Sequence, residues 1–265
     1  MGRSGQQFHN QRTLSKPCMC HDFSNSSSTD YYEEHAQVFF EDTVALDLSP
    51  LYARFLNRLP AGGHILDAGC GSGRDTRVFL DRGYAVTAVD ASPALARLAS
   101  THYGIPVQVM RFQEIDWRAR FDGIWACASL LHVPMMALPD VLRRLAVALK
   151  PQGVLYASFK YGQGEREHNA RRFTDLDEAG LVALLQAAPY FTVLDTWTTA
   201  DRRPGRAAEI WLNTLLKGVI AEVSQNPTLS EYEGRSAPGV NDRLHNNPAR
   251  HDISMACDWR NAVAK

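Results

Sequence analysis

The 265-residue sequence lacks an excess of charge of either sign, because 28 lysines and arginines balance 29 aspartates and glutamates and leave a net charge of −1. It therefore carries no electrostatic footprint for nucleic acid or for an anionic membrane. No uninterrupted apolar run approaches the ~20 residues of a membrane span, and the first residues lack the apolar segment of a signal peptide. We expect a cytoplasmic protein that binds neither nucleic acid nor membrane.

The sequence has few cysteines, five in all, and their odd number does not suggest a disulfide framework. Cys70 lies in a glycine-rich loop and Cys127 at the end of an apolar run, which fits a reducing compartment. Cys18, Cys20 and His21 are close together, but no second pair with zinc-site spacing accompanies them. We expect no metal site.

Hydrophobic residues make up 45% of the chain, enough for the core of one domain with tails. Residues 1–29 are polar and rich in serine and asparagine, so we predict a disordered N-terminal segment. A folded domain is predicted over 30–217. Residues 218–265 show no periodic pattern and are predicted to be mostly disordered.

Apolar runs and helix-compatible stretches alternate through the predicted domain. Strands are expected near 64–67, 85–89, 107–111, 121–126 and 154–159, which favours a parallel sheet covered by helices on both faces. One or two helices are expected between 38 and 59. Thr174, with Asp177 three residues later, resembles a capping box at the start of another helix. Two final strands, 191–197 and 209–216, are joined by a short link and should form a hairpin.

The most informative segment is the loop after the first strand, where Gly69, Gly71 and Gly73 alternate with other residues. Such a loop lets a ligand approach the main chain, and the next helix directs its free N–H groups at that ligand. A dinucleotide fingerprint would place its third glycine at position 74, which is Arg74. This spacing argues against a nicotinamide-dependent oxidoreductase.

The run Asp67-Ala68-Gly69-Cys70-Gly71-Ser72-Gly73 resembles the first motif of the class I S-adenosylmethionine (SAM) dependent methyltransferases. The likeness extends over residues 30–217 and is greatest to small bacterial methyltransferases, the group that includes the tellurite-resistance methyltransferases. It implies an α/β, Rossmann-like, doubly wound fold. The sheet would have seven mostly parallel strands with an antiparallel last strand, and SAM would be the cosubstrate.

The resemblance also implies a set of SAM-binding residues. They are Asp67, Gly69, Gly71 and Gly73 of the loop, Asp90, Ala91 and Ser92 after the second strand, Phe112, Gln113, Ala128 and Tyr32. Asp90 would accept hydrogen bonds from the ribose hydroxyls, although it could instead only cap the following helix. Phe112 suits either adenine stacking or the core. Either Tyr31 or Tyr32 would face the sulfonium, unless both are ordinary helix-start aromatics.

His132 is the candidate catalytic residue. It lies in Leu130-Leu131-His132-Val133, which resembles the fourth methyltransferase motif, between cosubstrate and acceptor. The ordinary pKa of histidine suits proton removal near neutral pH. Alternatively, His132 is a structural residue held by a backbone hydrogen bond.

The expected acceptor is a small molecule. The Asn-Pro-Pro-Tyr type of loop, found in methyltransferases of adenine or glutamine amino groups, is replaced by Cys127-Ala128-Ser129-Leu130. Lys160, Arg166, Arg171 and Arg172 would suit an anionic acceptor, or would form a solvated face. A macromolecular acceptor and a non-catalytic SAM-binding module remain alternatives, and the oligomeric state is left open.

Overall fold

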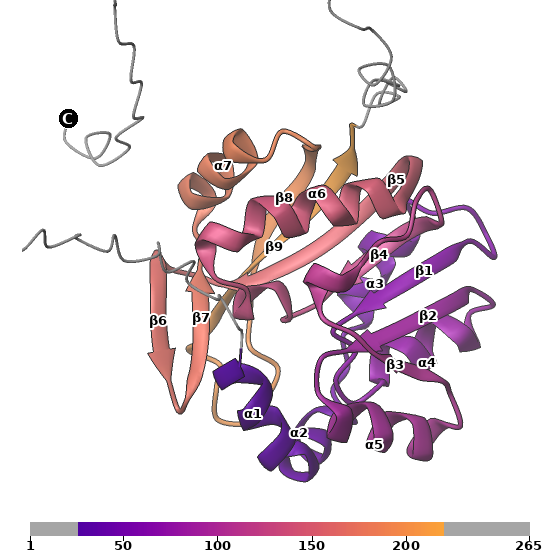
Figure 1. Ribbon diagram of the computed structural model, residues 1–265, viewed down its shortest axis with the longest axis vertical. Coiled ribbons are helices and arrows are strands. Elements are labelled where there is room, and N and C mark those ends of the chain that lie inside the picture. The colour runs from indigo at the N-terminus through magenta and orange to yellow at the C-terminus, as the bar shows by residue number, and fades with distance from the viewer. Residues whose placement is uncertain (1–25, 220–265) are drawn as a thin grey trace, which may run out of the picture. The chain divides into compact units, whose positions relative to one another are not determined.

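Strands and helices alternate through the structure, a computed structural model that describes residues 26–219 (Figure 1). The strands are β1 His64–Ala68, β2 Ala85–Asp90, β3 Val107–Val109, β4 Phe121–Ala126, β5 Leu149–Lys160, β6 Gly164–His168, β7 Arg171–Asp175, β8 Phe191–Ala200 and β9 Ile210–Gly218. The helices are α1 Ser26–Glu34, α2 Ala36–Thr43, α3 Ser49–Leu56, α4 Arg74–Asp81, α5 Pro93–Tyr103, α6 Leu138–Ala148 and α7 Glu178–Ala187, with short 3₁₀ turns at 112–114, 130–132 and 135–137.

The main sheet has seven strands in the order β3-β2-β1-β4-β5-β9-β8. The first five are parallel, whereas β9 runs antiparallel to both β5 and β8. This confirms the predicted doubly wound, mostly parallel sheet with an antiparallel last strand. The direction of winding reverses between β1 and β4, and ligands of such sheets bind at this switch point, beyond the carboxyl ends of the strands.

The two faces of the sheet carry separate hydrophobic cores. Successive side chains of a strand point to opposite faces, so Ile124 and Leu155 pack with α6 and α7. Trp125 and Tyr156 point the other way and stack with ring centroids 3.9 Å apart, in a core shared with α3. In Figure 1, α6 and α7 lie in front of the sheet and α3 lies behind it.

Helix α1 begins earlier than the sequence predicts. Residues 26–29 are helical, so the prediction of disorder through residue 29 is wrong for these four positions. The cause is a tertiary contact: the hydroxyl of Ser28 is buried and accepts a hydrogen bond from the backbone N–H of Arg172, at 3.0 Å. The Cys18, Cys20 and His21 cluster and the tail beyond residue 219 lie outside the described residues.

Strands β6 and β7 form an antiparallel hairpin that is separate from the main sheet and lies near α1 (Figure 1). The sequence pattern did not predict it, and the predicted helix start at Thr174 is wrong. Thr174 lies in β7, fully buried, and its hydroxyl donates to the carbonyl of Val133 at 2.8 Å. The N-cap of α7 is Asp177, whose carboxylate accepts from the N–H of Gly180 at 2.7 Å.

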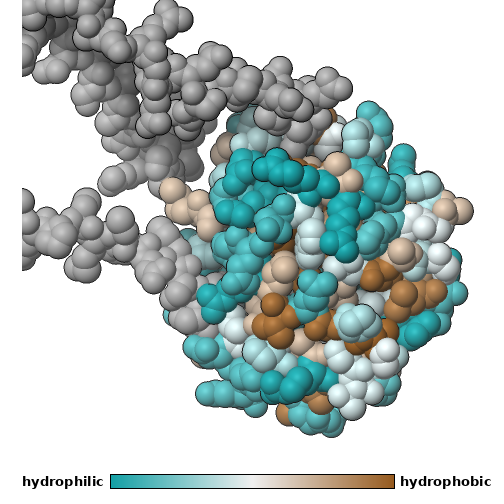
Figure 2. All heavy atoms as spheres, turned by 45° about the vertical axis from the view of Figure 1, so that its right-hand side comes forward, coloured by the Kyte–Doolittle hydropathy of each residue, from teal (hydrophilic) through white to brown (hydrophobic). Residues whose placement is uncertain are grey.

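The molecular face in Figure 2 is mostly hydrophilic, with a small group of apolar residues. Exposed apolar residues such as Val38, Val109 and Val193 belong to different elements, as is ordinary for a globular surface. None of the helices between residues 26 and 219 has the length and apolar character needed to cross a membrane.

Candidate functional site

A cavity of about 680 Å³ opens at the carboxyl ends of the parallel strands. Its floor includes the glycine loop after β1 and the ends of β2, β4 and β5. Helices α1 and α2, the β6–β7 hairpin and the link from β8 to β9 supply its other walls. Segments that are distant in the sequence therefore converge where the fold predicts a ligand.

The glycine loop is packed tightly against the loop that follows β4. The backbone N–H groups of Gly69 and Cys70 both donate to the carbonyl of Val89, at 2.9 and 3.0 Å. Gly69 has φ +83°, and a Cβ there would lie 2.4 Å from the Cβ of Ser129. Glycine is therefore required at position 69 both by its conformation and by space.

The carboxylate of Asp90 is held in place by two backbone N–H groups. Gly71 donates to one oxygen at 2.8 Å and Ser92 to the other at 2.9 Å. Burial raises the pKa of Asp90, against the opposing effect of these bonds. Each oxygen keeps capacity for a further hydrogen bond. Because the hydroxyl of Ser92 caps α5 by accepting from Leu95, Asp90 is not needed as the helix cap.

Most of the predicted site residues line the cavity. They are Tyr32, Gly69, Gly71, Asp90, Ala91, Ser92, Phe112, Ala128 and His132. Asp67, Gly73 and Gln113 are not among the lining residues. Asp67 is buried and accepts from the hydroxyl of Thr76 at 2.5 Å. A Cβ on Gly73 would lie 2.9 Å from that of Ala99, so this glycine permits the close approach of α5.

Burial and the neighbouring Asp75 raise the pKa of Asp67 to about 8. An unfolded chain would release this proton near pH 4, so the folded state binds more protons between about pH 4 and 8 and loses stability as pH rises through that window. We expect Asp67→Asn, which can still accept from Thr76, to flatten this decline. Denaturant unfolding from pH 5 to 8 measures it, and parallel pH profiles for the variant and the wild type would contradict the role of Asp67.

Hydrogen bonds at two places hold helix α1 over the cavity. The carboxylate of Glu33 accepts from the N–H of Ala94 at 2.8 Å and from the hydroxyl of Ser92 at 3.0 Å. The contact between Ser28 and Arg172 attaches the same helix to the hairpin. Tyr32, between these attachments, is thereby held against the cavity.

Tyr32 and His132 form a hydrogen-bonded pair with a defined direction. Nδ1 of His132 lies 2.8 Å from the carbonyl of Arg172 and Nε2 lies 2.8 Å from the hydroxyl of Tyr32. A carbonyl only accepts, so Nδ1 carries the proton and Nε2 accepts from Tyr32. Burial lowers the pKa of His132 to about 4, which leaves the imidazole neutral above about pH 5. His132 is therefore compatible with both interpretations from the sequence, a structural residue and a catalytic one, because a backbone carbonyl holds it and it also lines the cavity.

A buried ion pair beside the glycine loop was not predicted. The carboxylate of Asp75 pairs with Arg74 at 2.6 Å and accepts from the hydroxyl of Tyr52 at 2.5 Å and the indole N–H of Trp125 at 2.8 Å. Burial alone would raise the pKa of Asp75, but the charge of Arg74 and these donors outweigh it and hold that pKa below its usual value. In the sequence, only the adjacency of Arg74 and Asp75 hints at this ion pair, because the other partners of Asp75 come from α3 and β4.

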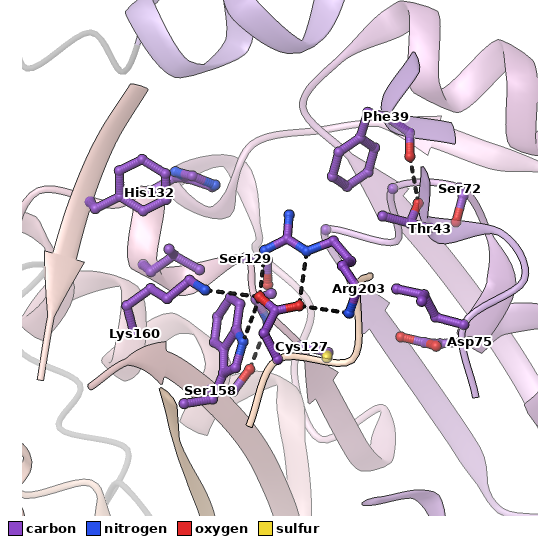
Figure 3. Close-up of a pocket in the computed structure, with 18 of the residues that line it drawn as sticks. Phe39, Thr43, Ser72, Asp75, Cys127, Ser129, His132, Ser158, Lys160 and Arg203 are labelled. Carbon is purple, nitrogen blue, oxygen red and sulfur yellow. Dashed lines mark hydrogen bonds and ion pairs between the residues drawn. The ribbon is translucent and has the colours of Figure 1, made fainter. Parts of the chain in front are cut away.

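Most cations at the cavity are already paired. Lys160 and Arg203 both reach the carboxylate of Asp201, at 3.0 and 2.6 Å (Figure 3), and Lys160 also pairs with Glu209. Arg166 pairs with Asp175, and Arg172, which lies outside the cavity lining, pairs with Glu165 at 3.3 Å. Of the four residues suggested for an anionic acceptor, only Arg171 has no ion pair within residues 26–219.

The structured part of the chain holds no group of three or more His, Cys, Asp or Glu side chains placed to bind a metal. Within it, Cys70 and Cys127 are both free.

Comparison with known proteins identifies the domain. Residues 65–153 match the model of the methyltransferase domain family. A ubiquinone biosynthesis O-methyltransferase of Xanthomonas axonopodis is 36% identical over 107 residues, which cover 37% of this chain and 44% of that enzyme. An uncharacterised methyltransferase of Staphylococcus carnosus is 28% identical, over 55% of this chain and 75% of its own length. The chain thus spans less than half of the first relative.

A solved structure is similar over most of the domain. The 1,6-didemethyltoxoflavin-N1-methyltransferase of Burkholderia thailandensis has a TM-score of 0.61 and 27% identity, with 79% of this chain and 93% of that chain covered. That enzyme was solved with bound 1,6-didemethyltoxoflavin and S-adenosylhomocysteine. The fold and the glycine-floored cavity define a Rossmann-like domain of the SAM-binding type. With the family match over residues 65–153, they support a class I SAM-dependent methyltransferase domain.

Proposed function

We propose that this protein transfers the methyl group of SAM to a small-molecule acceptor by in-line displacement. The observation that carries the proposal is one continuous cavity lined by the glycine loop, Asp90 and the Tyr32–His132 pair. The same cavity is covered by α1, α2 and the hairpin, which favours a small acceptor over a macromolecule. The ubiquinone and toxoflavin relatives, named for small-molecule substrates, support the same reading.

The lining residues fit SAM. The backbone at Gly69 and Gly71 leaves no side chain between the main chain and a ligand, and a Cβ at Gly71 would lie 3.1 Å from the ring of Phe39. Asp90 would accept from the ribose hydroxyls and Phe112 would lie against the adenine. SAM supplies a methyl group that is already activated by its sulfonium. The chain then has to align the acceptor and exclude water, which can contribute up to ~7–11 kcal/mol.

The Tyr32–His132 pair would accept the proton that the acceptor loses. Tyr32 lines the cavity and donates to Nε2 of His132. As the acceptor's O–H or N–H bond breaks, its proton passes to the oxygen of Tyr32 while the phenol proton passes to His132. Since the pKa of His132 is about 4, the imidazole is a weak base. Such a base suits an acceptor that is itself acidic.

Calorimetric titration of the purified chain with SAM, and separately with NAD, tests the cosubstrate. We expect SAM to bind and Asp90→Ala to weaken binding by about 100-fold, since both ribose hydroxyls lose a charged partner. Asp140→Ala, an exposed carboxylate of α6 outside the cavity lining, should bind like the wild type. Tighter binding of NAD, or no binding of SAM, would contradict the proposal.

A screen of small-molecule acceptors for release of S-adenosylhomocysteine then tests methyl transfer. We expect turnover with at least one planar phenol, acid or heterocycle. Binding of SAM without turnover on any small acceptor would instead favour a macromolecular acceptor or a non-catalytic SAM-binding module.

A further inference from the structure

Arg171 is a cation at the cavity that has no counter-charge among the residues that the structure describes. Within residues 26–219, its Nε is buried and has no hydrogen-bond partner, and no carboxylate forms an ion pair with it. By contrast, Lys160, Arg166 and Arg203 all have acidic partners.

Aromatic rings surround the guanidinium of Arg171. Its central carbon lies 4.2 Å from the ring centroid of Tyr31, 5.2 Å from that of Phe173 and 5.9 Å from that of Tyr32. Cation–π contacts of this kind stabilise the charge in part and hold the guanidinium in place. The hydroxyl of Tyr32 also takes part in a side-chain hydrogen bond with Arg171, but no carboxylate within residues 26–219 pairs with the guanidinium, so its charge remains available to an anionic ligand.

Arg171 lies beside the groups that would bind the acceptor and take its proton. Arg171 lines the cavity together with Tyr32, His132 and Phe173. After burial, the charge of Arg171 is among the influences on both partners of the pair: it lowers the pKa of His132 and opposes the rise in the pKa of Tyr32. A cation there favours the ionised form of whatever is bound beside it.

Aromatic side chains of the cavity favour a flat molecule. The aromatic residues that line it include Tyr32, Phe39, Phe173 and Trp211. The rings of Tyr32 and Phe39 meet edge to face at 5.0 Å, as do His132 and Phe173 at 5.1 Å. Flat walls of this kind pack against a planar ring more completely than against a branched aliphatic chain.

We propose that Arg171 binds the anionic group of a planar aromatic or heteroaromatic acid, and that such an acid is the methyl acceptor. The inference rests on the proposed methyltransferase function and names its substrate class. The guanidinium, held against Tyr31, presents N–H groups to a carboxylate or to an acidic ring oxygen or nitrogen, with geometry suited to paired hydrogen bonds. The same charge stabilises the negative charge that develops on the acceptor as its proton passes to Tyr32, which compensates for the weak base at His132.

Matched probes that differ only in charge test this assignment. The protein is saturated with S-adenosylhomocysteine and titrated with a panel of planar acids and their amides, for example 3,4-dihydroxybenzoate and 3,4-dihydroxybenzamide. We expect at least one acid to bind the wild type about tenfold or more tightly than its amide, because it gains charge-assisted hydrogen bonds. In Arg171→Met, which keeps an unbranched apolar side chain but removes the guanidinium over Tyr31, the two members of each pair should bind alike.

Arg172→Met is the matched control. Arg172 is the next residue of β7, pairs with Glu165 and is absent from the cavity lining, so this variant should keep the preference for the acid. Equal binding of acid and amide by the wild type, binding of no acid in the panel, or an unchanged preference in Arg171→Met would each overturn the inference.

Binding of S-adenosylhomocysteine separates this inference from the function on which it rests. We expect its affinity to be the same in the wild type and in Arg171→Met. A loss of more than tenfold in Arg171→Met would assign Arg171 to the carboxylate of the cosubstrate and overturn the inference alone. No binding by the wild type would instead reject the proposed methyltransferase function. Unfolding midpoints of both variants within a few degrees of the wild type would show that each one folds.

Discussion

Asp75→Ala should lower the free energy of unfolding by about 3–5 kcal/mol, the cost typical of removing one partner from a buried ion pair. Asp75 is only 5% exposed and accepts hydrogen bonds from Arg74, Tyr52 and Trp125. The variant leaves the charge of Arg74 with a single weaker contact, to the carbonyl of Thr43 at 3.2 Å. It also leaves two donors without an acceptor in the core between α3, α4 and β4. Urea unfolding followed by tryptophan fluorescence measures the change.

Asp81→Ala provides the comparison within the same helix. Asp81 pairs with Arg77 at i,i+4, and its side chain is 61% exposed. An exposed pair of this kind contributes less than about 1 kcal/mol. Equal losses for the two variants would mean that the buried position of Asp75 gives its ion pair no added weight. An unfolded Asp75→Ala beside a stable Asp75→Asn would still support the prediction, since asparagine keeps an oxygen for Tyr52 or Trp125.

The features that the sequence predicted correctly are those specified by neighbouring residues. The apolar run ending at Asp67, the three alternate glycines and the strand ending at Asp90 each carry their own turn or strand signal. Parallel strands bring their carboxyl ends to one edge, so Gly69, Asp90 and His132 were bound to meet once the alternation of strands and helices was recognised. Seven strands and the antiparallel position of β9 followed from the same local patterns and from the family resemblance.

The features that it missed depend on contacts between distant segments. Strand β6 is exposed along its whole length, so it has no alternation of apolar and polar residues to reveal it. Thr174 resembled a helix cap locally, but its hydroxyl is satisfied by Val133 of another loop. In the same way, four basic residues looked equivalent in the sequence. Only the packed structure shows that three of them form ion pairs with acidic residues, whereas Arg171 packs against aromatic rings.

Removing the hydroxyl in Tyr32→Phe should lower kcat by about 10²–10⁴-fold, the usual contribution of a positioned proton acceptor. The ring of Tyr32 and its edge-to-face contacts with Phe39 and His132 remain, so the KM for SAM should change little. Tyr31→Phe is the control, because Tyr31 is adjacent in α1 but absent from the cavity lining. The assay is release of S-adenosylhomocysteine with an acceptor found in the screen. A Tyr31→Phe defect as large as that of Tyr32→Phe would indicate that helix α1, not the phenol, is responsible.

The dependence of kcat on pH distinguishes proton transfer from a structural role for the pair. Because burial lowers the pKa of His132 to about 4, the wild type should keep its activity down to about pH 5 and lose it only as pH 4 is approached and the imidazole becomes charged. A half-maximal loss near pH 6.5, the ordinary pKa of histidine, would contradict this assignment. In Tyr32→Phe and His132→Gln, by contrast, kcat should rise with pH as the acceptor loses its proton to solvent, which replaces the missing base. A defect that stays constant from pH 6 to 9 would mean that the pair only holds α1 in place.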